Sequence, residues 1–165
     1  MSTKIDKTAF GRAMTAALDG PEREHIKFRN HDFQVRQISK TSNGNGTHVQ
    51  GHMFHQVNNF FDDKVLYSFD VVNGRTDNLE IRFQKGLDKF GDLVKKAIDV
   101  ASKAVQVVAA VSGGGNEKAD GTPGTGKIPR TEPANGTEDL LKDDGWKAEA
   151  RFLIANIAFR VPLNA

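Results

Sequence analysis

The sequence predicts an α+β fold, in which an antiparallel β-meander of 4–5 strands is covered on one face by a long helix, with further helices at both ends of the chain. Three patterns support this class. Apolar and polar residues alternate between residues 24 and 83, Asn-Gly and similar turn sequences separate the alternating segments, and a period near 3.6 residues appears before and after them. The length of 165 residues suits one such domain.

Residues 2–18 are predicted to form the first helix. Their apolar side chains recur on one stripe, and Ser2 or Thr3 would supply the N-cap. Gly20 and Pro21 end the pattern.

Two short strands are predicted next, at 24–29 and 33–38. The apolar positions are Ile26 and Phe28 in the first strand and Phe33 and Val35 in the second, so the parity of the alternation changes between them. A tight turn or a bulge at 30–32 would bring both apolar sets to one face of the sheet.

The meander is predicted to continue after a loop at 42–47, which is rich in Asn and Gly. Residues 48–57 alternate, so that one face would receive Val49, Gly51, Met53, His55 and Val57, and the other His48, Gln50, His52, Phe54 and Gln56. Residues 64–72 and 79–83 are the next strands, joined by a turn-rich connection at 73–78.

A long helix is predicted from Gly86 onward, stopping at Gly113, because its apolar residues keep a 3.6-residue period and its lysines lie mostly on the other side. The end of this helix is apolar nearly all round, at Val107, Val108 and Val111. Such a surface predicts burial by the domain or by a second copy of the chain. These three valines are therefore the expected contact of a homo-oligomer, in the simplest case a homodimer.

The chain is expected to divide into an α+β core domain at 1–115, a flexible Gly/Pro-rich linker or loop at 116–136, and a C-terminal helix at 137–165 that packs back on the core. The last helix is expected to be interrupted at Gly145 and to stop at Pro162. A strand is the alternative for 151–161, although the period fits a helix better.

The predicted linker contains GTPGTGK at 121–127, which imitates a phosphate-binding loop. Ile128 replaces the hydroxyl that binds Mg²⁺, Pro129 stands where a helix should begin, and no apolar strand precedes Gly121. No nucleotide is therefore expected at 121–127, and no cofactor is expected elsewhere.

Composition restricts the classes of function. A net charge of +2 provides little general attraction for nucleic acid or anionic membranes, and the lack of cysteine excludes disulfides, zinc–cysteine sites and thiol nucleophiles. No signal peptide and no apolar run of about 20 residues is visible. The cytoplasm is thus the default location, and export without a leader is compatible with the same sequence.

The histidines are the candidates for metal binding and acid–base chemistry. His48 and His52 would share the polar face of a strand, where His31 or Asp62 of a neighbouring strand could complete a metal site. Solvent-facing imidazoles are the favoured interpretation, because no helical His-Glu-x-x-His pattern accompanies them.

His55 would instead point inward, where its ring nitrogens need partners or titrate. A contact with the carboxylates at 62–63 is one way to supply a partner. No nucleophile motif is present, so an enzyme is less expected than a binding protein.

The polar face of the predicted sheet is the leading candidate site, because it is more basic than the chain as a whole. The predicted ligand- or partner-binding residues on it are Lys27, Arg29, Arg36, His48, His52 and Arg82. The first hypothesis is a non-catalytic binding or assembly module that self-associates and recognises a partner through this face. Binding of single-stranded nucleic acid or another polyanion is the second, and a His-based metal-dependent enzyme is the third.

Overall fold

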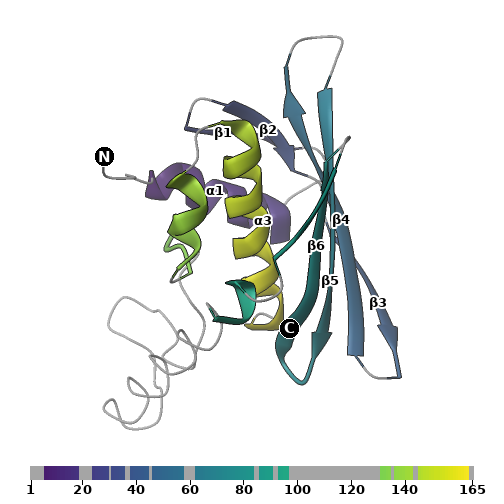
Figure 1. Cartoon of the computed structure of the whole chain (residues 1–165). Coiled ribbons are helices and arrows are strands. Elements are labelled where there is room, and N and C mark those ends of the chain that lie inside the picture. The colour runs from purple at the N-terminus through teal and green to yellow at the C-terminus, as the bar shows by residue number, and fades with distance from the viewer. Residues whose placement is uncertain are drawn as a thin grey trace, which may run out of the picture.

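The structure is a computed structural model in which helices lie on one face of an antiparallel sheet (Figure 1). The described residues are 6–18, 24–29, 31–35, 38–44, 46–57, 62–83, 86–90, 93–96, 131–134, 136–142 and 145–163. Seven strands form the sheet in the order β1-β2-β4-β5-β6-β7, and β3 pairs with β4 beside this path. The predicted α+β class is confirmed, with more strands than expected. We call the face that carries the helices the inner face and the opposite one the outer face.

Helix α1 (Lys7–Leu18) packs against β1 and buries Phe10, Met14 and Ala17. The predicted N-caps were wrong for this helix. The cap is Asp6, whose Oδ1 accepts hydrogen bonds from the backbone amides of Thr8 at 2.9 Å and Ala9 at 3.1 Å. A carboxylate in this position also complements the positive end of the helix dipole.

Strands β1 (Glu24–Phe28) and β2 (His31–Val35) form a hairpin in which Phe28 pairs with His31. The connection is therefore a two-residue turn that includes Arg29 at φ 56°, slightly earlier than predicted. The apolar residues of both strands are buried on the inner face, as the change of parity predicted.

Strands β3 (Ser39–Asn43) and β4 (Gly46–Gln56) form the next hairpin. The predicted loop at 42–47 was too long, because β3 is a polar edge strand without the alternation that marks a half-buried strand. One edge of β4 is shared, since β3 pairs with 46–50 and β2 pairs with 53–56.

Strands β5 (Asp62–Val72) and β6 (Arg75–Phe83) complete the centre of the sheet. Asn73 and Gly74 form the whole connection, with φ of 52° and 75°, so the predicted connection at 73–78 was also too long. A bulge near Asn78, at φ 54°, shifts the register between β5 and β6. Because of this bulge, both Thr76 and Leu79 are buried on the inner face.

The predicted long helix was wrong at its start. Gly86–Lys89 form strand β7, which pairs with β6, and a helical turn follows at 93–96. A four-residue segment is too short for apolar periodicity to distinguish strand from helix. Val94 of the helical turn is buried in the core. The predicted oligomer contact at Val107, Val108 and Val111 lies outside the described residues.

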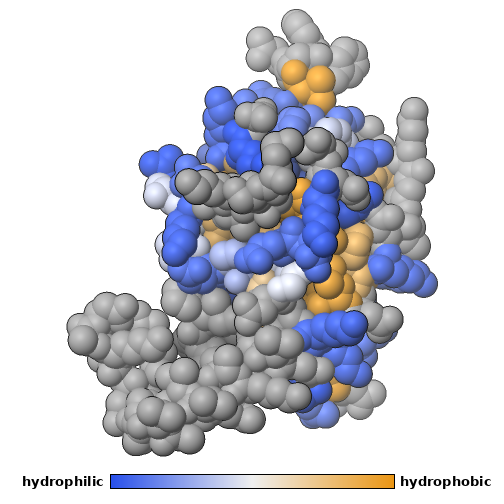
Figure 2. Space-filling model, turned by 60° about the vertical axis from the view of Figure 1, so that its left-hand side comes forward, coloured by the Kyte–Doolittle hydropathy of each residue, from blue (hydrophilic) through white to orange (hydrophobic). Residues whose placement is uncertain are grey.

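Helix α3 (Trp146–Leu163) covers the inner face, where it contacts β5, β6 and α1 (Figure 1). A short 3-10 helix, η1 (Thr137–Lys142), precedes it, and Gly145 separates the two at φ 117°. Every residue of α3 from Phe152 to Val161 is buried. Seen toward the helices, the described surface is largely hydrophilic, with hydrophobic residues visible between the polar ones (Figure 2). Within the described part of the chain, no helix is long and apolar enough to cross a membrane.

The buried Asn156 joins α3 to residues 131–137, at the end of the predicted linker. Its Oδ1 accepts hydrogen bonds from the backbone amide of Ala134 at 2.7 Å and from Nη1 of Arg160 at 3.0 Å. Its Nδ2 donates to Oγ1 of Thr137 at 3.2 Å. This segment is therefore held by specific polar contacts, whereas 121–127 lies outside the described residues.

Candidate functional site

The predicted contact residues do not form one cluster. Lys27 lies on β1, Arg29 in the turn after it, His48 and His52 on β4, and Arg82 on β6, whereas Arg36 lies outside the described residues. Three strands separate β1 from β6, which corresponds to about 19 Å across the sheet. Of the predicted set, only His52 and Arg82 share a row of the outer face, with Leu66 between them.

The spacing of His48 and His52 on one strand does not suit a shared metal ion. The two residues are four positions apart on β4, which is about 13 Å along an extended chain. Metal–nitrogen bonds are only about 2 Å long. Among the described residues, no group of three or more His, Cys, Asp or Glu side chains is placed to hold a metal ion.

The outer face carries acidic side chains as well as basic ones. The register places Asp32, Asp70, Asp77 and Glu80 on this face, together with Lys27, Lys64, Arg82 and Lys89. Lys89 pairs with Glu80 at 3.7 Å between Nζ and Oε1. The expected basic excess is therefore small once the acids of β2, β5 and β6 are included.

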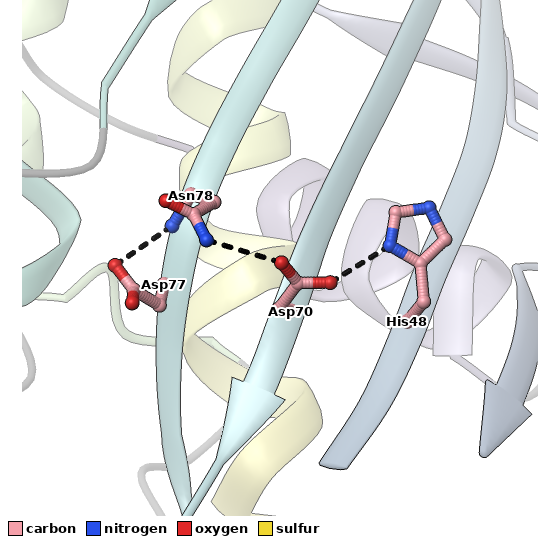
Figure 3. Close-up of polar contacts among 4 residues, drawn as sticks. All are labelled: His48, Asp70, Asp77 and Asn78. Atoms are coloured by element: carbon pink, nitrogen blue, oxygen red, sulfur yellow. Dashed lines mark hydrogen bonds and ion pairs between the residues drawn. The ribbon is translucent and has the colours of Figure 1, made fainter. Parts of the chain in front are cut away.

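A polar network crosses β4, β5 and β6 at one end of the outer face (Figure 3). Nδ1 of His48 lies 2.8 Å from Oδ1 of Asp70, and Nδ2 of Asn78 donates to Oδ2 of Asp70 at 3.1 Å. The backbone amide of Asn78 donates to Oδ1 of Asp77 at 2.9 Å. The hydrogen bonds from His48 and then Asn78 lower the pKa of Asp70. The bulge thus supplies one residue that bridges two carboxylates on adjacent strands.

An apolar centre lies beside this network. Leu66 is 38% exposed and stands opposite His52, whose ring centroid is 6.4 Å from that of Phe54. Polar residues surround these three, among them Gln50, Ser68 and Lys64. An apolar centre with a polar rim is the usual anatomy of a protein interface.

A second cluster lies on the inner face, where the N-terminal turn of α3 meets β2. Nδ1 of His31 is 2.5 Å from Oε2 of Glu149. The Glu149 side chain is 3% exposed and that of His31 is 30% exposed. The pair therefore connects the buried side of α3 to a partly accessible imidazole. Glu149 could not be associated with His31 from the sequence, because 118 positions separate them.

His55 belongs to the same cluster and points inward, as predicted. Its ring stacks on Trp146 with centroids 4.5 Å apart, and its Nδ1 lies 3.5 Å from Oδ2 of Asp63. Burial lowers the pKa of His55, and Asp63 opposes that effect. Because the imidazoles are engaged with Trp146 and Glu149, we interpret this cluster as a joint between α3 and the sheet.

Comparison with protein-family models, with curated proteins and with solved structures finds no match to this chain. Function is therefore inferred from the geometry and chemistry of the described residues.

Proposed function

We propose that the protein is a non-catalytic assembly module that forms a homodimer through the outer face of its sheet. The observation that carries this proposal is the separation of charge along β5 and β6. In the middle of these strands, Lys64 and Arg82 lie toward one end, and Glu80, Asp70 and Asp77 lie toward the other. The register places Asp62 and Arg75 beyond them, at the two extreme ends of the strands. The apolar centre of Leu66, Phe54 and His52 stands beside the basic end.

The charges of this pattern are self-complementary. A two-fold axis in the interface plane, perpendicular to the strands, would lay each strand antiparallel on its own copy. Lys64 would then face Asp70 of the second copy, and Arg82 would face its Glu80. Opposite charges would meet in both halves of the interface. A two-fold axis parallel to the strands would keep their direction. Like charges of the two copies would then lie at the same height along the strands.

The size of the face also suits a dimer. β4 and β5 have 11 residues each and β6 has nine, so these strands alone present roughly 500 Å². With β2, β3 and β7 the sheet presents on the order of 700 Å², close to the ~800 Å² per partner of a standard interface. Two sheets that pack face to face in this way form a β-sandwich across the dimer.

Binding of single-stranded nucleic acid is less well supported, because such a platform needs a basic face with stacked aromatic residues. The acids of the outer face balance most of its basic residues. A polyanion partner would instead predict retention on a phosphate-bearing resin that decreases with salt and is abolished by Arg82→Glu.

The first test compares two exposed hydrophobic residues by light scattering. Leu66→Asp places a charge at the apolar centre and should convert the dimer to a monomer. Val57→Asp is the matched control, because Val57 is 54% exposed but follows the end of β4, away from the centre. A wild-type chain that stays monomeric at every concentration tested would refute the proposal. Loss of the dimer in Val108→Asp but not in Leu66→Asp would indicate that the interface lies on the predicted long helix instead.

The second test exchanges the charges that the proposed symmetry brings together. Arg82→Glu should weaken the dimer because it places two acidic groups face to face, and Glu80→Arg should weaken it by placing two basic groups face to face. The double variant restores opposite charges across the interface and should recover dimerisation. A double variant as weak as either single variant would contradict the proposed two-fold arrangement.

A further inference from the structure

A groove of about 440 Å³ lies between helix α1 and strand β1, away from the apolar centre of the outer face. Ala9 of α1 and the nearly buried Ile26 of β1 contribute apolar surface to it. Arg12, Lys27 and Arg29 also line the groove, and all three are exposed. The groove therefore combines an apolar strip with positive charge from a helix, a strand and a turn.

Among the described residues, the three cations make no polar contact. No hydrogen bond or ion pair joins Arg12, Lys27 or Arg29 to any part of the chain that the structure describes. The acidic residue of the groove, Asp6, is already occupied, because its Oδ1 caps α1 through two backbone amides. His25 is also occupied, since its Nε2 lies 3.0 Å from Nε2 of Gln34. The described residues that line the groove thus carry more positive than negative charge, which favours an anionic ligand.

The backbone of β1 adds a second feature. Within the described residues β1 pairs only with β2, and its residues His25, Ile26 and Lys27 line the groove, so we infer that its other edge faces the groove. Phe28 pairs with His31 across the two-residue turn, and successive residues direct their backbone groups to opposite sides of a strand. The amide and carbonyl groups of His25 and Lys27 are therefore expected to point away from β2. An extended chain could pair with them, as in strand addition to a sheet edge.

We propose that this groove binds an extended acidic peptide segment, which adds to the sheet as a strand beside β1. Alternate side chains of such a strand point to opposite faces of the sheet. Apolar side chains would face Ala9 and Ile26 beneath α1, and acidic side chains would face Lys27. Arg12 and Arg29 would contact further carboxylates of the ligand. The ligand class is thus an alternating apolar and acidic segment of a partner protein.

The test uses the full chain and a fluorescein-labelled peptide of alternating Glu and Val, with binding followed by fluorescence anisotropy. Saturable binding is expected, with protection of the Lys27 amide in hydrogen exchange. A peptide of alternating Lys and Val reverses the charge and should not bind. A third peptide replaces the central Val residues by Pro, which removes backbone N–H groups and should abolish binding.

Variants locate the site. Arg12→Glu with Arg29→Glu should weaken binding of the acidic peptide by roughly tenfold or more. Lys40→Glu with Lys95→Glu makes the same change of charge on exposed residues of β3 and of the helical turn at 93–96, outside the groove lining, and should leave the affinity near that of the wild type. Far-UV circular dichroism and the urea midpoint establish that each variant is folded.

Three results would overturn the proposal. They are no binding of the acidic peptide, equal weakening by both pairs of variants, and undiminished binding of the proline-containing peptide. The last result would indicate an anion contact without strand addition. The inference is independent of the proposed dimer, because Leu66→Asp should leave peptide affinity unchanged whatever its effect on oligomeric state.

Discussion

A substitution at Gly51 tests the strand register that assigns residues to the outer face. It lies on β4 directly opposite Tyr67 of β5, a residue that is 2% exposed. A Cβ atom at Gly51 would meet the Tyr67 hydroxyl oxygen at 2.4 Å and Cζ at 2.5 Å. Ordinary contacts begin at 3.4 Å, so the Tyr67 ring would have to move by about 1 Å (3.4 − 2.4) in a closely packed core.

We expect Gly51→Ala to lower the free energy of unfolding by about 1–3 kcal/mol, the range observed when a packed core is overfilled. For a chain of this size, each kcal/mol corresponds to a fall in Tm of about 2–4 °C. Urea unfolding followed by circular dichroism gives the free energy, and a thermal scan gives Tm. Tyr67→Phe in the same chain should restore part of the loss, because it removes the nearest atom and leaves Cζ in place.

Gly44→Ala is the matched control, since a Cβ atom at Gly44 has no heavy atom within 4 Å and the position does not require positive φ. Its stability should equal or slightly exceed that of the wild type. Wild-type stability of Gly51→Ala would refute the pairing of Gly51 with Tyr67. The assignment of His52 and Phe54 to the outer face would then be lost as well.

Three further predictions concern the contacts of α3 and the buried imidazole. Glu149→Gln should lower the free energy of unfolding by about 1–3 kcal/mol, and a double-mutant cycle with His31→Ala should give a coupling of at least about 0.5 kcal/mol; zero coupling would contradict the 2.5 Å contact. Asn156→Ala should cost about 2–4 kcal/mol in guanidinium unfolding, because it leaves the buried amide of Ala134 without its acceptor, and an unchanged midpoint would argue against that network. Burial lowers the pKa of His55 below 6.5 in the folded chain. Between pH 6.5 and that lower pKa, His55 is therefore protonated in the unfolded chain but not in the folded chain. Stability should therefore fall as the pH decreases through that window, by at most about 1.4 kcal/mol per pH unit, and His55→Gln should reduce the slope of the urea midpoint against pH; an identical slope would refute the role of His55.

The sequence predicts the central strands well because their inner faces are buried. Val49, Met53 and His55 are buried and alternate with polar or less buried positions, and this period is visible without any tertiary information. The change of parity between Phe28 and Phe33 likewise requires a turn. The polar edge strand β3 lacks such a signal, because neither its composition nor its period distinguishes it from a loop.

The remaining features depend on contacts that are distant in the sequence. Strand β7 exists because it pairs with β6, whereas its apolar spacing also fits the start of a helix. The charge balance of the outer face could be assessed only from the strand register. The register places Asp32, Asp70 and Asp77 beside the basic residues that the alternation had identified. The pairing of His31 with Glu149 joins two elements that only tertiary packing brings together.

The divided edge of β4 gives one continuous strand two different neighbours on the same side. β3 is bonded to its first half and β2 to its second, and neither is paired with Gly51 or His52. This seam should exchange its amide hydrogens sooner than the paired positions on either side. The β1–β2 hairpin should therefore be able to loosen from residues 53–56 of β4 while β3 stays paired with 46–50.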